Sequence, residues 1–249
     1  MKQLGIFGDS YAEIRPPAKQ WPWLVTGWSY RFKKELGEDC GVHGAGGSSH
    51  LWNFRQFLEN HEKYQQVIFT VTNLHRISMP VRLIDKQTGK MTIRTHFPSY
   101  KHIEECMKYH HFEQNLGQRM LDYLVYISKP LEDSAKDVHL ATIKYIQQIR
   151  PDAVIVPAFP TVTTGELGLG YNWCLVDIDL NETRNWFVRD GLTPWVDPRA
   201  NHMSPKSNLW VYEHMKARLR GEFIQWNNTL TPSYNSEQEF NDALANFAN

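Results

Sequence analysis

The sequence predicts an α/β protein in which a parallel sheet is covered by helices on both faces. Segments of strand length alternate with segments that carry apolar residues at helical spacing. The strand segments are apolar along their whole length, which is typical of strands buried on both faces. Short glycine-rich or polar segments follow several of these strands. In open parallel sheets, such segments at the carboxyl ends of the strands form the binding crevice.

The first part of the chain is predicted to hold strands at 2–7, 40–43 and 67–71. A helix is predicted between the first two strands from apolar residues at three- and four-residue steps: Trp21, Leu24, Val25, Trp28, Phe32 and Leu36. A second helix would follow Ser48 or Ser49, either of which can serve as its N-cap. The apolar face of this helix is predicted to comprise Leu51, Phe54, Phe57 and Leu58.

An irregular segment at about 74–116 is predicted to be an insertion or lid. It contains the signature of a hairpin, with Gly89 in the turn between two short apolar runs. The elements predicted after the insertion are helices at 116–126 and 134–149, a strand at 152–157, and a helix from Pro205 to about Leu219 with Ser204 as its cap.

We expect residues 1–225 to form a single domain and residues 226–249 to form a C-terminal arm. The arm contains a capping box from Ser236 to Glu239. Apolar residues follow at helical spacing: Phe240, Ala243, Leu244 and Phe247. This pattern predicts a short amphipathic helix that docks either on its own domain or on a neighbouring subunit of a homo-oligomer. The sequence leaves both arrangements open.

The composition argues against several classes of function. The 27 Lys and Arg residues balance the 27 Asp and Glu residues, so the basic excess typical of nucleic-acid binding is absent. No apolar run reaches the roughly 18 residues that a membrane span requires, and the N-terminal run is too short for a signal peptide. We therefore expect a cytoplasmic or virion-associated protein. The odd, widely spaced cysteines favour buried thiols over disulfides: Cys40, Cys106 and Cys174.

The residues that carry chemistry lie at the predicted ends of strands and before the last helix of the domain. Ser10 follows the first strand, and a serine hydroxyl needs a base to become a nucleophile. His202 is the candidate base, and Asp197 is close enough in sequence to orient its ring. An acyl-transfer intermediate also needs donors for its oxyanion. Gly47 can offer an unhindered backbone N–H, and Asn73 can offer a side-chain amide.

At these residues the chain resembles the SGNH hydrolase superfamily, also called GDSL-type esterases and lipases, and in particular its divergent bacterial and phage members. The resemblance rests on Gly8-Asp9-Ser10, Gly47, Asn73 and His202, which occur in the order of the family's blocks. It implies a three-layer α/β/α sandwich with a flavodoxin-like parallel sheet. It also implies a Ser10 nucleophile, a His202 base, an oxyanion hole formed by Ser10, Gly47 and Asn73, and ester hydrolysis without metal or cofactor.

Two departures from the family pattern bear on activity. The third block usually reads Gly-x-Asn-Asp, and only Asn73 matches it here. The last block usually places an aspartate three residues before the histidine, where this chain has Arg199. Asp197 lies five residues before His202, so either it completes a triad or the site works as a Ser–His dyad.

Several other polar residues lie near these blocks. His75 and Arg76 follow Asn73 closely and are candidates to line the pocket, together with Asp9, for which the resemblance implies a structural role. No metal site is predicted, because the histidines and glutamates between 104 and 113 match no known zinc spacing.

The sequence therefore favours a serine esterase acting on a small-molecule, glycan or lipid ester, for instance a deacetylase. The alternative is a catalytically weak or inactive binding or structural module with the same fold, such as a virion or cell-surface component, because fold does not fix function.

Overall fold

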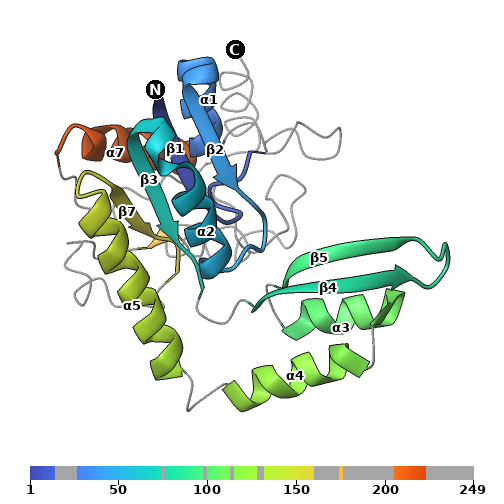
Figure 1. Cartoon of the computed structure of the whole chain (residues 1–249). Coiled ribbons are helices and arrows are strands. Elements are labelled where there is room, and N and C mark those ends of the chain that lie inside the picture. The colour runs from blue at the N-terminus through green and yellow to red at the C-terminus, as the bar shows by residue number, and fades with distance from the viewer. Residues whose placement is uncertain are drawn as a thin grey trace, which may run out of the picture.

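A four-stranded parallel sheet forms the centre of the protein (Figure 1). The computed structural model describes residues 1–14, 27–73, 77–97, 100–112, 115–127, 132–159, 174–175 and 205–222. The strands are β1 (Lys2–Gly8), β2 (Cys40–Gly44), β3 (Tyr64–Val71) and β7 (Val154–Pro157), and they pair in the order β2-β1-β3-β7. The predicted α/β class and parallel sheet are confirmed.

Successive residues of the strands point to opposite faces of the sheet, and each face meets its own pair of helices. Ile6 and Ile68 belong to a buried cluster with residues of α1 (Trp28–Leu36) and α7 (Pro205–Leu219). Phe7 and Phe69 belong to a second cluster with residues of α2 (His50–Asn60) and α5 (Glu132–Ile149). Burial on both faces explains why the strands are mainly apolar beyond the exposed polar residues near the starts of β1 and β3.

The ends of the helices differ from the prediction in two places. Helix α1 begins at Trp28 and not at Trp21, because Gly27 has an extended backbone with φ −54° and ψ 143°. Residues 21–26 lie outside the described residues. Helix α5 begins at Glu132, two residues before the expected Ser134.

The buried faces of α2 and α5 also differ from the prediction. Leu51 and Leu58 are exposed, and α2 instead buries His50 and Asn53 together with the expected Phe57. Val138 of α5 is likewise exposed.

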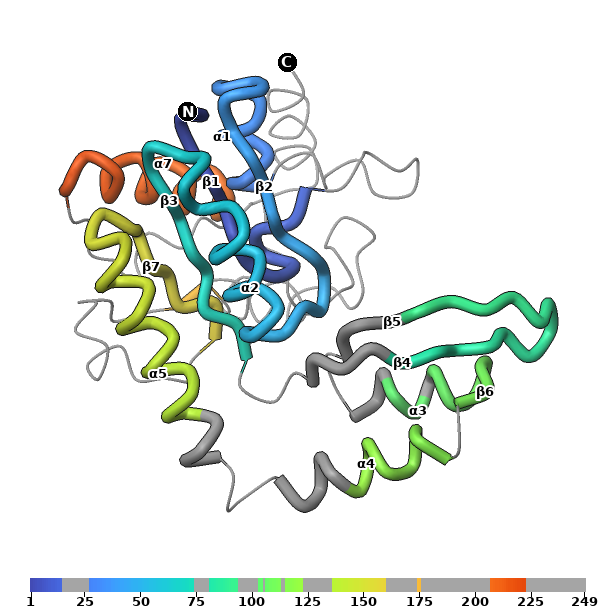
Figure 2. Tube along the Cα trace, in the orientation of Figure 1, coloured from blue at the N-terminus to red at the C-terminus, as the bar shows by residue number. Residues whose placement is uncertain are grey.

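The segment after β3 forms a second unit (Figure 2). Strands β4 (Ile77–Asp85), β5 (Met91–Phe97) and β6 (His110–Phe112) form an antiparallel sheet in the order β5-β4-β6. The predicted hairpin is confirmed, and Gly89 in its turn has a φ of +66°. Two helices pack on this sheet, α3 (Tyr100–Tyr109) and α4 (Leu116–Ile127). Their common core comprises Val81, Leu83, Ile103, Cys106, Met120 and Leu121.

Because α4 packs with α3, the second unit extends to Ile127, beyond the expected range of 74–116. The chain then enters α5 and returns to the parallel sheet through β7 (Figure 2).

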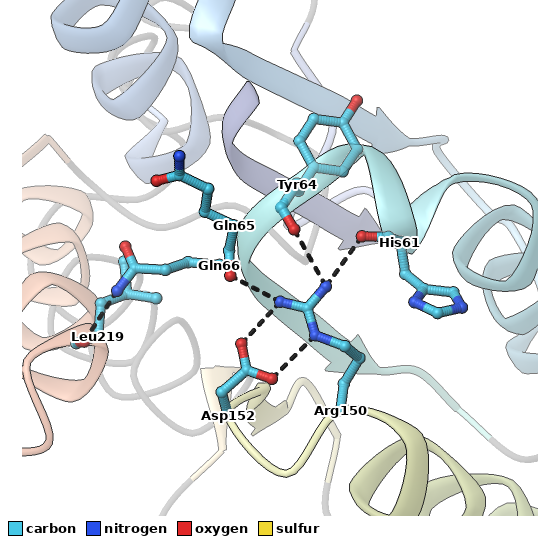
Figure 3. Close-up of polar contacts among 7 residues, drawn as sticks. All are labelled: His61, Tyr64, Gln65, Gln66, Arg150, Asp152 and Leu219. Atoms are coloured by element: carbon cyan, nitrogen blue, oxygen red, sulfur yellow. Dashed lines mark hydrogen bonds and ion pairs between the residues drawn. The ribbon is translucent and has the colours of Figure 1, made fainter. Parts of the chain in front are cut away.

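Arg150 locks the start of β3 to the end of α5 (Figure 3). Its guanidinium donates to the carbonyl oxygens of His61 in the short 3-10 helix η3 (His61–Lys63), of Tyr64 and of Gln65, at 2.8–3.2 Å. It also forms a paired interaction with Asp152, with distances of 2.8 and 2.6 Å. The same hydrogen bonds hold the pKa of the Asp152 carboxyl below its usual range.

The described cysteines are buried, as the sequence predicts. Burial raises the pKa of the Cys40 thiol to about 11, which keeps it protonated near neutral pH. A second 3-10 helix, η2 (Gly37–Asp39), leads from α1 into β2. Among the described helices, none combines the length and the apolar character needed to cross a bilayer.

Candidate active site

Three of the candidate residues lie at one edge of the parallel sheet. In the register, Gly8 lies beside Gly44, and Phe7 lies beside Phe69, so β1, β2 and β3 end at nearly the same level. Ser10, Gly47 and Asn73 follow these strand ends by only two or three residues. The carboxyl edge of the sheet therefore collects the segments expected to carry the nucleophile and the oxyanion donors.

The buried carboxylate of Asp9 organises the loop after β1. Its Oδ1 accepts a hydrogen bond from the Tyr11 backbone N–H at 3.1 Å, and its Oδ2 accepts one from Thr72 Oγ1 at 2.6 Å. Asp9 and Thr72 are both fully buried, whereas Ser10 between them in the loop is half-buried. The arrangement fixes the backbone on both sides of Ser10 and leaves part of that residue accessible.

The loop after β2 is tied to the end of β1. The Gly8 carbonyl accepts a hydrogen bond from the Ala45 N–H at 3.2 Å, and Ser48 Oγ lies at the same distance from it. Ser48 Oγ also lies 2.6 Å from Asn53 Oδ1 in the first turns of α2. Gly47 has a φ of +74°, a backbone conformation that glycine adopts without steric cost.

Close packing around two glycines brings the loops together. A Cβ on Gly8 would lie 1.8 Å from Thr70 Oγ1, and a Cβ on Gly44 would lie 2.6 Å from the backbone of Ala12 and Glu13. The segment that carries Ser10 therefore lies directly against the end of β2, at a distance that a side chain on Gly44 would prevent.

Helix α2 begins at this same edge. Ser49 is its N-cap and accepts a hydrogen bond from the Trp52 N–H at 3.2 Å, so of the two predicted caps the structure selects Ser49. The N-terminus of a helix carries a partial positive charge. The loop containing Gly47 thus leads into a helix end that favours negative charge.

Asn73 lies two residues beyond β3 and is half-buried. The preceding residue, Thr72, is the one that donates to Asp9, so the same hydrogen bond anchors the segment of Asn73. The Ala158 N–H donates to the Val71 carbonyl at 2.9 Å and continues the sheet past the end of β7.

The direction of α7 is fixed by contacts at both of its ends. Gln66, near the start of β3, donates through Nε2 to the carbonyl of Leu219, the last residue of α7, at 3.0 Å (Figure 3). Near its other end, Asn208 Oδ1 accepts from the Trp28 N–H at 3.1 Å. The helix therefore runs opposite to the strands and begins at their carboxyl edge. His202, Asp197, His75 and Arg76 lie outside the described residues.

Two histidines beside the glycine-rich loop pack against aromatic side chains. The His43 ring stacks on Phe7 with centroids 4.8 Å apart, and its Nε2 lies 2.8 Å from the Tyr64 hydroxyl. His50 is buried and stacks on His139 with centroids 3.7 Å apart. Burial lowers the pKa of His43 and, more strongly, that of His50. Both rings are therefore held by packing contacts with neighbouring side chains.

The pairing of Thr72 with Asp9 is not apparent from the sequence, because their contact spans 63 positions of the chain. The Ser48–Asn53 pair is likewise not apparent from the sequence. The one available signal was the placement of small polar residues directly after buried strands. Within the residues that the structure describes, no group of three or more His, Cys, Asp or Glu side chains could hold a metal ion.

No protein-family model matches this chain, and no curated protein matches it in sequence.

Proposed function

We propose that this protein is a serine esterase of the SGNH type, with Ser10 as the nucleophile and His202 as its base. In this proposal the Ser10 and Gly47 backbone N–H groups and the Asn73 amide form the oxyanion hole. Asp197 would orient the imidazole, or the site would work as a Ser–His dyad. The substrate class is an acyl ester of a small molecule, a sugar or a lipid.

The observation that carries the proposal is the tying together of three loops at one sheet edge. The Asp9–Thr72 hydrogen bond links the loop of Ser10 to that of Asn73. The Ala45–Gly8 hydrogen bond links the loop of Gly47 to the strand that leads to Ser10. A nucleophile and oxyanion donors must be held in place before reaction, and such cross-links are what holds them.

The direction of α7 supports His202 as the base. The helix begins with Pro205 at the carboxyl edge of the sheet, the same edge at which Ser10 follows β1. Three residues of extended chain span at most about 11 Å, so His202 is tethered within that distance of Pro205. If α7 began elsewhere, for example at the amino edge of the sheet, its position would have argued against the pairing of His202 with Ser10.

The strand order also fits the proposal. The parallel strands β1, β2, β3 and β7 adopt the order 2-1-3-4, which is the beginning of the flavodoxin-like order. We therefore propose that the whole domain is a three-layer α/β/α sandwich of the SGNH hydrolase type.

The reaction would proceed in two steps. Ser10 Oγ attacks the ester carbonyl carbon while His202 takes the hydroxyl proton, and the carbonyl oxygen becomes an oxyanion held by the three donors. The intermediate collapses, the bond to the alcohol breaks, and His202 returns the proton to the departing alcohol. His202 then takes a proton from water, and the resulting hydroxide attacks the acyl-serine carbonyl carbon. The bond to Ser10 Oγ breaks, His202 returns the proton to Oγ, and the carboxylic acid leaves.

The decisive experiment is covalent labelling of the purified protein with a fluorophosphonate, followed by peptide mapping. The label should attach to Ser10, and Ser10→Ala should abolish both labelling and hydrolysis of p-nitrophenyl acetate. Ser29→Ala is the matched control, because it makes the same change at a buried serine of α1 and should leave both readouts intact. Unchanged hydrolysis in Ser10→Ala would refute the assignment.

Asn73→Ala tests the oxyanion hole separately. Loss of one donor should lower turnover by about a hundred- to a thousand-fold. A folded wild-type protein that neither takes the label nor hydrolyses the ester would instead favour the alternative, an inactive binding or structural module. The observation that favours this alternative is Arg199, which stands where the family has an aspartate.

A further inference from the structure

The β4–β5 hairpin has two faces of different character. Val81 and Leu83 point inward and belong to the core shared with α3 and α4. The opposite face, which we call the outer face, contains Ile84 paired with Met91, and Ile93 paired with Arg82. The outer face has three exposed apolar residues: Ile84 is 43% exposed, Met91 58% and Ile93 64%. A cluster of exposed aliphatic side chains on one face marks a surface for interaction.

The outer face is bordered by positive charge. Arg82 lies on the face itself and Lys90 lies at the turn, and both residues are exposed. Lys86, also at the turn, donates through Nζ to the Met107 carbonyl of α3 at 2.7 Å. The only acidic residue between 82 and 93 is Asp85. Its carboxylate is occupied by the turn, where it accepts hydrogen bonds from the Gln87 and Thr88 backbone and from the Thr88 hydroxyl. The chain as a whole carries no net charge, so this excess is local.

We propose that the outer face of this hairpin binds to the surface of an anionic lipid membrane. Aliphatic side chains that enter the acyl boundary, with flexible cations reaching the headgroups, are the features by which peripheral proteins bind such surfaces. The hairpin extends away from the parallel sheet, so it can reach a flat surface (Figure 1). This inference does not depend on the proposed esterase function.

Two other occupants fit the observations less well. A two-fold dimer through this face would bring the like charges of Arg82 and Lys90 together across a symmetric interface. A single-stranded nucleic acid would match the charge, but platforms for bases are aromatic, and Ile84, Met91 and Ile93 are aliphatic.

The test is co-sedimentation of the full chain with vesicles of phosphatidylcholine alone and of phosphatidylcholine mixed with phosphatidylserine. The wild-type protein should sediment with the mixed vesicles only, and added salt should weaken the binding. The variant Arg82→Gln with Lys90→Gln should lower the partition coefficient by about 25-fold, because each lysine or arginine near an anionic surface changes binding by about five-fold.

A second variant tests the apolar contribution. Ile84→Thr, Met91→Thr and Ile93→Thr combined should also lose vesicle binding, and threonine keeps the strand preference of these positions. The matched control is Leu51→Gln with Leu58→Gln, which removes exposed leucines from α2 and should bind as the wild type does. Circular dichroism and thermal melting check that each variant folds.

The proposal is overturned if the wild-type protein does not bind the mixed vesicles, or if both hairpin variants bind them as well as the wild type does. It is also overturned if the wild type is a dimer in sedimentation velocity and the threonine variant is a monomer, because a second copy would then cover this face.

Discussion

Asp9 Oδ2 accepts a hydrogen bond from Thr72 Oγ1 at 2.6 Å, and this contact joins two loops that are 63 residues apart in the chain. Asp9 precedes Ser10 and Thr72 precedes Asn73, so one interaction sets the spacing of the proposed nucleophile and of an oxyanion donor. Both partners are fully buried. A buried carboxylate is costly without partners, which makes the pair sensitive to substitution.

Thr72→Val removes the hydroxyl and keeps the shape of the side chain. The variant should lose about 1.5–3 kcal/mol of unfolding free energy, the range for a hydrogen bond to a charged group. Ester hydrolysis should fall as well, because Asn73 loses its anchor. Urea unfolding gives the free energy. Thr70→Val, in β3 two residues earlier, is the control: its hydroxyl makes only a 3.4 Å contact with the Phe7 carbonyl, and its loss should cost less than about 1 kcal/mol. Equal losses in the two variants would contradict the special role of the Asp9 contact.

Gly44→Ala should disturb the loop of Ser10. The new Cβ would lie 2.6 Å from backbone atoms of Ala12 and Glu13, which cannot move aside as a flexible side chain would. We expect a loss of about 1–3 kcal/mol, the range for overpacking, and slower fluorophosphonate labelling of Ser10.

Gly37→Ala is the control for a change of glycine to alanine. Gly37 has a φ of +56° and open space around the Cβ position, so the substitution introduces backbone strain without a clash. It should cost about 1–3 kcal/mol, the range for a sparsely populated backbone region, and leave labelling at the wild-type rate. Normal labelling in Gly44→Ala would show that the loop does not depend on this close approach.

Arg150→Lys tests the lock at the opposite edge of the sheet. Lysine cannot reproduce a planar fork that meets three carbonyl oxygens and both oxygens of Asp152. The free energy of unfolding should fall by about 2 kcal/mol, with no direct effect on ester hydrolysis. Arg220→Lys is the comparison, because Arg220 and its partner Glu222 are both more than half exposed, and it should leave stability nearly unchanged. An Arg150→Lys protein with the wild-type free energy of unfolding would contradict the stabilising role of Arg150.

The predicted elements succeeded where local sequence determines structure. The run at 67–71 has the length of a strand and is one, because burial on both faces favours apolar side chains. Its one polar residue, Thr70, is buried with its hydroxyl 3.4 Å from the Phe7 carbonyl. Pro205 opens a helix as expected, since its missing N–H is not needed there. The hairpin turn at Gly89 likewise follows from local chemistry.

The errors occur where contacts distant in sequence decide which side of a helix is buried. Helix α2 buries His50, which stacks on His139, and Asn53, which contacts Ser48, and this rotation leaves Leu51 exposed. The same stacking turns His139 inward on α5 and leaves Val138 in solvent. A periodicity of apolar residues carries no information about such polar pairs.

The candidate site shows the same division. That Ser10, Gly47 and Asn73 share one edge follows from the parallel sheet, so the sequence was sufficient to predict it. The hydrogen bond between Asp9 and Thr72 was not predictable, because it depends on the register of β1 and β3. The pairing of Ser10 with His202 stays a prediction.

His214 should make stability depend on pH. It is buried on α7 and stacks on Trp210 with centroids 5.2 Å apart. Burial, assisted by the nearby charge of Arg218, lowers its pKa from 6.5 to about 4. Between these values the unfolded chain binds a proton that the folded protein does not bind, so stability falls as the pH decreases from 6.5 to 4. The full loss from this one group is about 3 kcal/mol.

His214→Phe keeps an aromatic ring beside Trp210 and removes the titration. Whatever its effect at neutral pH, the variant should show a flatter dependence of unfolding free energy on pH between 4 and 6.5, measured by urea unfolding. Some slope should remain, because burial also lowers the pKa values of His43 and His50. Arg218→Gln removes only the smaller cause and should flatten the curve much less. Protonation of His214 places a charge in the core beside the sheet, and the burial of this side chain on α7 makes that charge costly. An unchanged slope in His214→Phe would mean that the folded protein accepts the charge at no cost, which would contradict the prediction.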